Sequence, residues 1–253
     1  MDEVFVAKDS IVRQIWGKAD TVLFIFAGAA AEFALNKAVD WLYFTGRLPA
    51  DPLGRLFSTV AYARQIIFAK KDDALNAIDQ ITAIHKSVEK NRGTNIPDWA
   101  YRDVLFLLID YSIRSFELLE RPLTGDEKEE VFRVFWRVGE RMQLNNLPED
   151  FAAWLVMRDS HLNSDLVKSE FTDDLYKQYK KHLGLIRYRL LLRVQFNLAP
   201  QKVNKLLGLK ESIGFKPLLG FYKFSRLFKA DRLLKAALLP GDYKARIKAL
   251  DVN

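Results

Sequence analysis

The sequence of 253 residues contains no cysteine. It can therefore form no disulfide, hold no iron–sulfur cluster through thiolates, and carry neither a thiolate-ligated nor a covalently attached c-type haem. Glycine and proline are modest, at 12 and 8 residues, and nothing in the composition is typical of a disordered chain. A chain of this length buries enough surface to fold without a disulfide or a metal. The composition indicates one globular domain.

Several catalytic motifs are absent as well. The sequence has no Gly-x-Ser-x-Gly elbow, no phosphate-binding loop, no dinucleotide fingerprint and no His-Glu-x-x-His. The Glu-x-x-His pattern of di-iron bundles is also missing, because Thr82, Arg158 and Tyr179 stand three positions before the three histidines. The commonest hydrolase, nucleotide-binding, zinc-peptidase and di-iron classes are therefore without support.

Long hydrophobic runs are lacking too. The most apolar stretch, from Val22 to Leu35, is too short to span a bilayer and is interrupted by Glu32, so it predicts a buried core helix. The first residues are acidic before they are apolar, which is the wrong order for a secretory signal. We therefore expect a cytoplasmic protein.

The remaining sequence has a helical period. Apolar residues recur every three to four positions through 98–121, 125–144 and 184–198, and no stretch alternates as a strand would. All eight prolines fall where this period breaks. Asp51-Pro52 is typical of a helix start, and Thr124 with Glu127 forms a capping box. The prediction is an all-α multi-helix bundle.

Charge is divided unevenly along the chain. Residues 1–173 carry 21 Lys and Arg against 27 Asp and Glu, whereas residues 174–253 carry 18 against 5. A basic amphipathic helix is predicted near the C-terminus, with an apolar arc and a basic face. The arc comprises Phe221, Phe224, Leu227, Phe228 and Leu234, and the basic face Lys223, Arg226, Lys229 and Arg232.

Two interpretations of this basic region stay open. The helix could lie on an anionic membrane surface, or it could pack on its own domain like an ordinary amphipathic helix. We expect no nucleic acid as a partner, because no recognised binding module accompanies the charge. The expected organisation is a main helical domain over residues 1–213, with residues 214–253 as a basic helical extension packed on it.

The candidate site residues are a histidine and an arginine–threonine pair. His85 lies on the apolar face of a helix predicted over 72–91, where it is either a buried core histidine or a metal ligand. Arg55 and Thr59 are four residues apart, so both project from one helix face. They either anchor a ligand or are a surface arginine and a threonine bonded to its own turn. His161 and His182 stand among polar residues, and we expect them to be solvated or capping.

Read in order, several segments resemble the catalytic domain shared by MpaB-type oxygenases and latex-clearing rubber oxygenases. Residues 51–59 (DPLGRLFST) resemble the helix of the family that carries an arginine and a threonine, and residues 84–88 (IHKSV) resemble its histidine helix. Residues 100–112, the Leu-Thr start at 123–130 and the Leu-Pro turn at 147–148 follow in the expected order. The resemblance covers residues 10–210.

The resemblance implies an all-helical fold that holds haem b between core helices. It places the axial iron ligand on His85, and Arg55 and Thr59 beside the haem as binding and catalytic residues. It also implies an oxygenase that uses dioxygen on an apolar substrate, such as an unsaturated lipid or isoprenoid.

The sequence departs from the family at three places. The glycine that often follows the histidine motif is replaced around Glu89-Lys90. Ser58 stands where rubber oxygenases have a lysine, and the distal carboxylate matches either Glu32, Asp40 or neither. Two alternatives therefore accompany the oxygenase hypothesis. One is a helical binding or scaffold protein that has lost haem, and the other is a peripheral membrane module that binds lipid.

Overall fold

Eleven helices and no strand are found in the part of the chain that the computed structural model describes, which is residues 3–46, 50–211 and 214–227. Two isolated bridges join Val4 to Lys70 and Asn36 to Leu166. The predicted all-α fold is confirmed. The helices are α1 (Ile11–Trp16), α2 (Ala19–Phe33), α3 (Val39–Phe44), α5 (Pro52–Phe68), α6 (Lys71–Arg92), α7 (Asp98–Leu119), α8 (Gly125–Arg141), α9 (Phe151–Ser164), α10 (Glu170–Leu198), α11 (Gln201–Leu207) and α12 (Phe215–Leu227).

The helix starts are set by the residues that the sequence indicated. The Asp51 side chain accepts a hydrogen bond from the backbone N–H of Gly54 at 2.8 Å, and Pro52 occupies the first turn of α5. Thr124 and Glu127 form both hydrogen bonds of the predicted capping box. These bonds satisfy backbone N–H groups that have no partner inside the helix. Proline and capping residues therefore position α5 and α8 along the chain.

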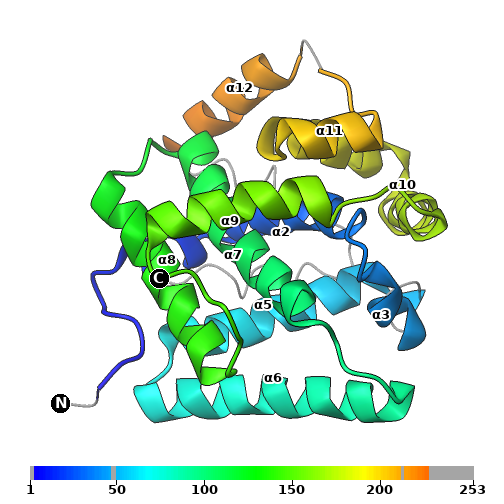
Figure 1. Cartoon of the computed structure of the whole chain (residues 1–253). Coiled ribbons are helices and arrows are strands. Elements are labelled where there is room, and N and C mark those ends of the chain that lie inside the picture. The colour runs from blue at the N-terminus through cyan, green and yellow to red at the C-terminus, as the bar shows by residue number, and fades with distance from the viewer. Residues whose placement is uncertain (1–2, 47–49, 212–213, 228–253) are drawn as a thin grey trace.

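The packing of α2 against α7 is the centre of the core (Figure 1). The two helices approach closely at Gly28, where a Cβ atom would collide with the ring of Tyr111. Trp16 at the end of α1 donates a hydrogen bond to Ser112 of α7 at 3.1 Å. The predicted core helix over 22–35 is thus confirmed as α2. Helix α9 crosses the same region, whereas α6 lies at the edge of the domain with α5 beside it (Figure 1).

Helix α10 contains a sharp corner. Gly184 has φ +71° and ψ 170°, a conformation that glycine adopts without the steric penalty of a Cβ atom. The two residues after it, Leu185 and Ile186, are exposed. The helix predicted over 184–198 is therefore the second arm of a longer, bent element.

Helix α12 attaches to the domain through apolar and polar groups. Phe215 is buried in the main core and Leu219 packs against it. The Tyr222 hydroxyl donates to Asp20 at 2.9 Å, and Arg226 pairs with Glu120 at 2.5 Å. The opposite side presents Phe221 and Phe224, which are 62% and 58% exposed. Residues 228–253, which include Phe228 and Leu234 of the predicted apolar arc, lie outside the described residues. Within the described residues, no helix has both the length and the hydropathy needed to cross a membrane.

Candidate functional site

Helix α5 carries the predicted arginine and threonine. Arg55 and Thr59 are both partly buried and lie one helical turn apart. The Thr59 hydroxyl donates to the backbone carbonyl of Arg55 at 3.2 Å, and the Ser58 hydroxyl donates to the same carbonyl at 2.7 Å. The threonine is therefore bonded to its own preceding turn, as one of the two interpretations expected. Only a rotation about χ1 would aim its hydroxyl elsewhere.

Helix α6 carries His85, which is partly buried beside α5 and α7. Its ring packs edge-on against Tyr101, with 5.2 Å between the ring centroids. Among the described residues, its buried Nδ1 atom has no hydrogen-bond partner. Burial lowers the pKa of His85, and the positive charge of the neighbouring Arg55 lowers it further. The fold thus brings Arg55 and His85 together and keeps the imidazole neutral near pH 7.

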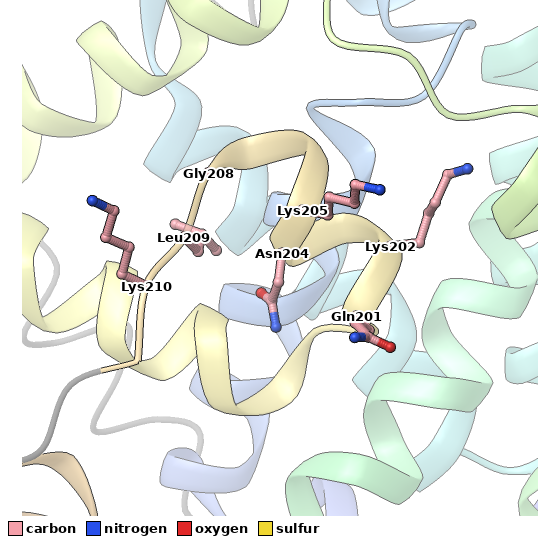
Figure 2. A pocket seen from close by; sticks show the side chains of 7 residues that line it. All are labelled: Gln201, Lys202, Asn204, Lys205, Gly208, Leu209 and Lys210. Carbon is pink, nitrogen blue, oxygen red and sulfur yellow. The ribbon is translucent and has the colours of Figure 1, made fainter.

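The side chains of this α5–α6 site suit a haem. A neutral imidazole with an unpaired nitrogen is a good iron ligand, and a guanidinium pairs well with a propionate carboxylate. Two of the hollows on the described surface have volumes of about 630 and 620 Å³. The first lies around α11 (Figure 2), and neither is lined by Arg55, Thr59 or His85.

A second polar region lies deep between α2, α7 and α9. Arg158 on α9 donates to both oxygens of the Glu32 carboxylate on α2, at 2.5 and 2.7 Å, and to Asp110 on α7 at 2.8 Å. The Tyr111 hydroxyl donates to Glu32 at 3.0 Å. Burial alone would lower the pKa of Arg158, but Glu32 and Asp110 raise it, so the guanidinium stays charged. These four residues form the buried ion-pair network.

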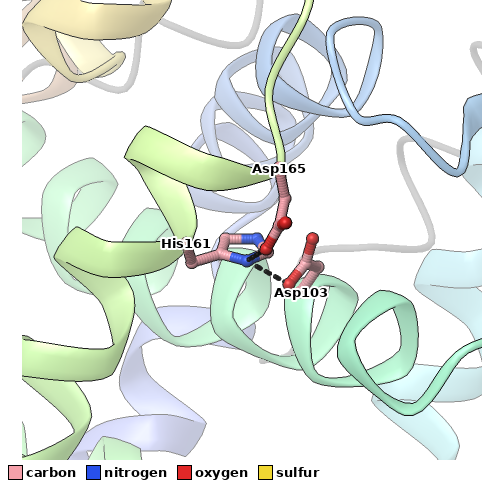
Figure 3. Close-up of side chains that lie close together, drawn as sticks. All are labelled: Asp103, His161 and Asp165. Atoms are coloured by element: carbon pink, nitrogen blue, oxygen red, sulfur yellow. Dashed lines mark hydrogen bonds and ion pairs between the residues drawn. The ribbon is translucent and has the colours of Figure 1, made fainter.

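A cluster of two carboxylates and a histidine adjoins this network (Figure 3). His161 Nδ1 contacts Asp103 Oδ1 and lies 2.8 Å from Asp165 Oδ2. The amide of Asn36 donates to the other Asp103 oxygen at 2.7 Å. Burial lowers the pKa of His161 more than Asp165 and Glu32 raise it, so the ring is neutral near pH 7. Asp103, His161 and Asp165 form the carboxylate–histidine cluster.

The expectation for His161 needs correction. His161 is neither solvated nor capping, because it is only 5% exposed and faces α7. Neither carboxylate considered for the distal position is unpaired: Glu32 binds Arg158 and Tyr111, and Asp40 binds Arg92 at 2.6 Å. His182 is partly buried, with an Nε2 atom that has no partner among the described residues.

A signal for the missed region is present in the sequence. Arg158 and His161 are three residues apart on α9, a spacing that places both on one helix face. Glu32 interrupts the apolar run of α2, and Asn36 lies just after the end of that helix. Polar residues in such positions indicate a buried polar contact, although they do not identify its partner.

Comparisons with known proteins point to one family. The family model described as "ER-bound oxygenase mpaB/B'/Rubber oxygenase, catalytic domain" matches residues 13–228. The match includes α5, α6, α7 and α9 and thus both polar regions. It confirms the resemblance inferred from the motifs. Comparisons with curated proteins and with solved structures found no match.

Proposed function

The chain belongs to the family of ER-bound mpaB/B' and rubber oxygenase catalytic domains, and from this premise we propose that it is a haem b-dependent oxygenase acting on an apolar substrate. Membership of the family supports an oxygenase-type domain. The cofactor and the substrate class are the proposal. We place dioxygen and an unsaturated lipid or isoprenoid as the reactants.

The observation that carries the proposal is the state of His85. Its Nδ1 atom is buried without a partner, and its pKa is lowered by burial and by Arg55. An imidazole that is neutral and under-bonded is ready to accept a metal ion. In the proposed complex His85 is the axial ligand, and the edge-on Tyr101 ring holds its orientation.

The neighbouring side chains have separate roles in this proposal. Arg55 binds a propionate carboxylate, which needs a cation at the edge of an apolar pocket. The Thr59 hydroxyl, which donates to the Arg55 carbonyl, can rotate away from it and donate a hydrogen bond toward dioxygen or substrate instead. When bound, haem supplies the iron that activates dioxygen for attack on an unsaturated carbon.

A binding protein without haem is the second candidate. Both hydroxyls of the motif, on Ser58 and Thr59, are bonded to the Arg55 carbonyl, and Ser58 replaces the family's lysine. A domain that kept the fold and lost the chemistry would have these features. It would purify colourless, take up no haem, and bind apolar ligands without turning them over.

The test is the absorption spectrum of the chain expressed with haem precursor, before and after dithionite. We expect a Soret band that shifts on reduction, and we expect His85→Ala to lose the band or change its form. His182→Ala is the matched control, because His182 is also a partly buried helical histidine with an unpartnered nitrogen. This control should keep the wild-type spectrum.

Two results would reject the haem proposal. A wild-type protein that stays colourless and takes up no added haem would leave the binding protein as the function. A Soret band that is identical in wild type and His85→Ala would place the iron on another ligand. If the band behaves as expected, oxygen consumption with unsaturated lipids tests the substrate class.

We also propose that an otherwise cytoplasmic chain binds an anionic membrane surface through α12. One side of the helix packs on the domain, with Phe215 in the core and Tyr222 and Arg226 in polar contacts. The other side presents Phe221 and Phe224 outward, beside Lys223. Exposed aromatic rings next to cations suit the interface of an anionic bilayer. Such a contact would bring the domain to a lipophilic substrate.

Cosedimentation with phosphatidylserine-containing vesicles tests this contact. Phe221→Ser with Phe224→Ser should reduce binding, and high salt should weaken what remains. Val156→Ser is the control, because Val156 is equally apolar and exposed but lies on α9. Equal binding by both variants, or no binding by the wild type, would reject the proposal.

A further inference from the structure

We propose that the carboxylate–histidine cluster is a binding site for a divalent transition-metal cation, with Asp103, His161 and Asp165 as its ligands. Its three ligand atoms all lie within 4.8 Å of one another. They come from the first half of α7, the last turn of α9 and the residue after α9. The side chains converge on one point between these elements (Figure 3). This site is separate from the α5–α6 site and does not depend on haem.

Charge is the first argument for a cation. In the buried ion-pair network, Glu32 and Asp110 share Arg158, and Asp110 also pairs with Arg114 at 2.7 Å. Asp103 and Asp165 form no ion pair with any lysine or arginine in the described part of the chain. A buried carboxylate without a cation is costly, because little water is present to solvate it. A single divalent ion would neutralise the negative charges of both carboxylates.

Hydrogen bonding is the second argument. Both carboxylates approach the same nitrogen, His161 Nδ1, but a ring nitrogen carries at most one proton. One carboxylate oxygen is therefore left facing the nitrogen without a hydrogen between them. A cation placed among the three atoms would bind all of them at once.

The tautomer of His161 leaves Nδ1 available as a ligand. His161 is 5% exposed, and its Nε2 atom has no hydrogen-bond partner among the described residues. Because no group donates a hydrogen bond to Nε2, nothing forces the ring proton onto Nδ1. The proton can reside on Nε2, which leaves the Nδ1 lone pair facing the two carboxylates. Asn36 holds Asp103 from behind, as groups that orient metal ligands commonly do.

The ligand set indicates the kind of metal and its route. One imidazole and two carboxylates suit Zn²⁺, Mn²⁺ or Fe²⁺ better than Mg²⁺ or Ca²⁺, which bind mainly oxygen. The Asp103 side chain is buried, whereas that of Asp165 is 22% exposed. A cation would therefore enter beside Asp165. Once bound, it would tie the C-terminal end of α9 to α7, next to Asn36.

The test measures Zn²⁺ and Co²⁺ binding to the full chain, purified without added haem and stripped with a chelator. We expect one Zn²⁺ per chain, a raised thermal midpoint with Zn²⁺, and visible d–d absorption from bound Co²⁺. Removing a group that only orients a ligand costs roughly 10–100-fold in metal affinity. Asp165→Asn, which removes a ligand, should therefore weaken binding by at least roughly that factor.

The controls separate this site from others. Asp159→Asn changes an exposed carboxylate of the same helix, and His85→Ala changes the proposed haem ligand; both should bind Zn²⁺ as the wild type does. Asp103→Asn is a second ligand variant, but Asp165→Asn is the safer one because Asp165 is partly exposed. A wild type that binds no Zn²⁺ or Co²⁺, or an Asp165→Asn variant that folds and binds normally, would overturn the proposal.

Discussion

The histidines of α6 and α9 have contrasting surroundings. His85 lies at the edge of the domain, with the cation Arg55 beside it and no partner for its buried nitrogen. His161 lies in the interior, with two carboxylates at one nitrogen. Both rings are neutral near pH 7, because burial lowers both pKa values. At His85, a buried ring nitrogen therefore lacks a hydrogen-bond partner. At His161, two carboxylates lack a cation.

This difference indicates how much each histidine contributes to the stability of the fold. Loss of His85 removes little that the folded chain itself uses: one hydrogen bond to the backbone of Ile81 and the contact with the Tyr101 ring. Loss of Arg158 leaves the buried Glu32 carboxylate with the Tyr111 hydroxyl as its donor and without a cation, and loss of His161 leaves the buried Asp103 carboxylate with only the Asn36 amide. Stability should therefore respond strongly to changes between α2, α7 and α9, whereas changes at the α5–α6 site should affect ligand binding instead.

The largest effect is expected from Arg158→Met. The substitution keeps much of the side-chain volume but leaves the Glu32 carboxylate buried without a cation. Breaking a buried ion pair in this way costs about 3–5 kcal/mol of unfolding free energy. Arg133→Met is the control, because Arg133 pairs with Glu129 on the surface and such pairs contribute about 0–1 kcal/mol. Similar losses in urea unfolding would contradict the comparison.

Alanine at the two histidines compares the sites directly. His161→Ala removes the donor between Asp103 and Asp165 and should cost about 3 kcal/mol, since the groups left behind are buried and charged. His85→Ala removes one hydrogen bond to the backbone of Ile81 and should cost about 1 kcal/mol. Urea unfolding with chelator present measures both without bound metal. If His85→Ala were the more damaging variant, the contrast drawn between the sites would be wrong.

The sequence predicted the fold well because its signals are local. Pro52 behind Asp51 and the pair Thr124–Glu127 act within a few residues, and each begins a helix where it was expected. The apolar period similarly predicts which face of a helix is buried. The approach of α5 to α6 followed from motif order, since the two helices are joined by a short turn.

The buried polar region could not be predicted in the same way. The polar residues before His161 in the sequence, Arg158, Asp159 and Ser160, predict a solvated position, but Arg158 is itself buried on the same face of α9. The actual partner of His161, Asp103, is 58 residues away, and Arg158 meets Glu32 across 126 residues. Such pairings depend on how three helices cross, which helical spacing alone does not determine.

Gly28→Ala probes the crossing that supports the buried ion-pair network. A Cβ atom at Gly28 would collide with the ring of Tyr111, whose hydroxyl donates to Glu32. Overpacking of this kind costs about 1–3 kcal/mol. Gly125→Ala is the control, because a Cβ atom there has open space. Thermal unfolding should separate the two variants, and a Gly28→Ala protein as stable as Gly125→Ala would show that the crossing can adjust.

The smallest effect concerns an ion pair that is only partly buried. Glu120 binds Lys18 at 2.8 Å and Arg226 of α12 at 2.5 Å. Burial alone would raise the pKa of Glu120, but the two cations lower it below its ordinary value. Glu120→Gln should cost about 0.5–1 kcal/mol at neutral pH, because solvent weakens exposed pairs.

The difference in unfolding free energy between wild type and Glu120→Gln should depend on pH. A carboxyl whose pKa is lower in the folded state stabilises the fold above its unfolded pKa, and the stabilisation is lost as pH falls through the folded pKa. The gap in unfolding free energy between wild type and Glu120→Gln should therefore close in acid. If it stays constant from neutral pH to acid, the charge of Glu120 does not hold α12 on the domain. The contrast between buried and exposed pairs would then rest on Arg158 and Arg133 alone.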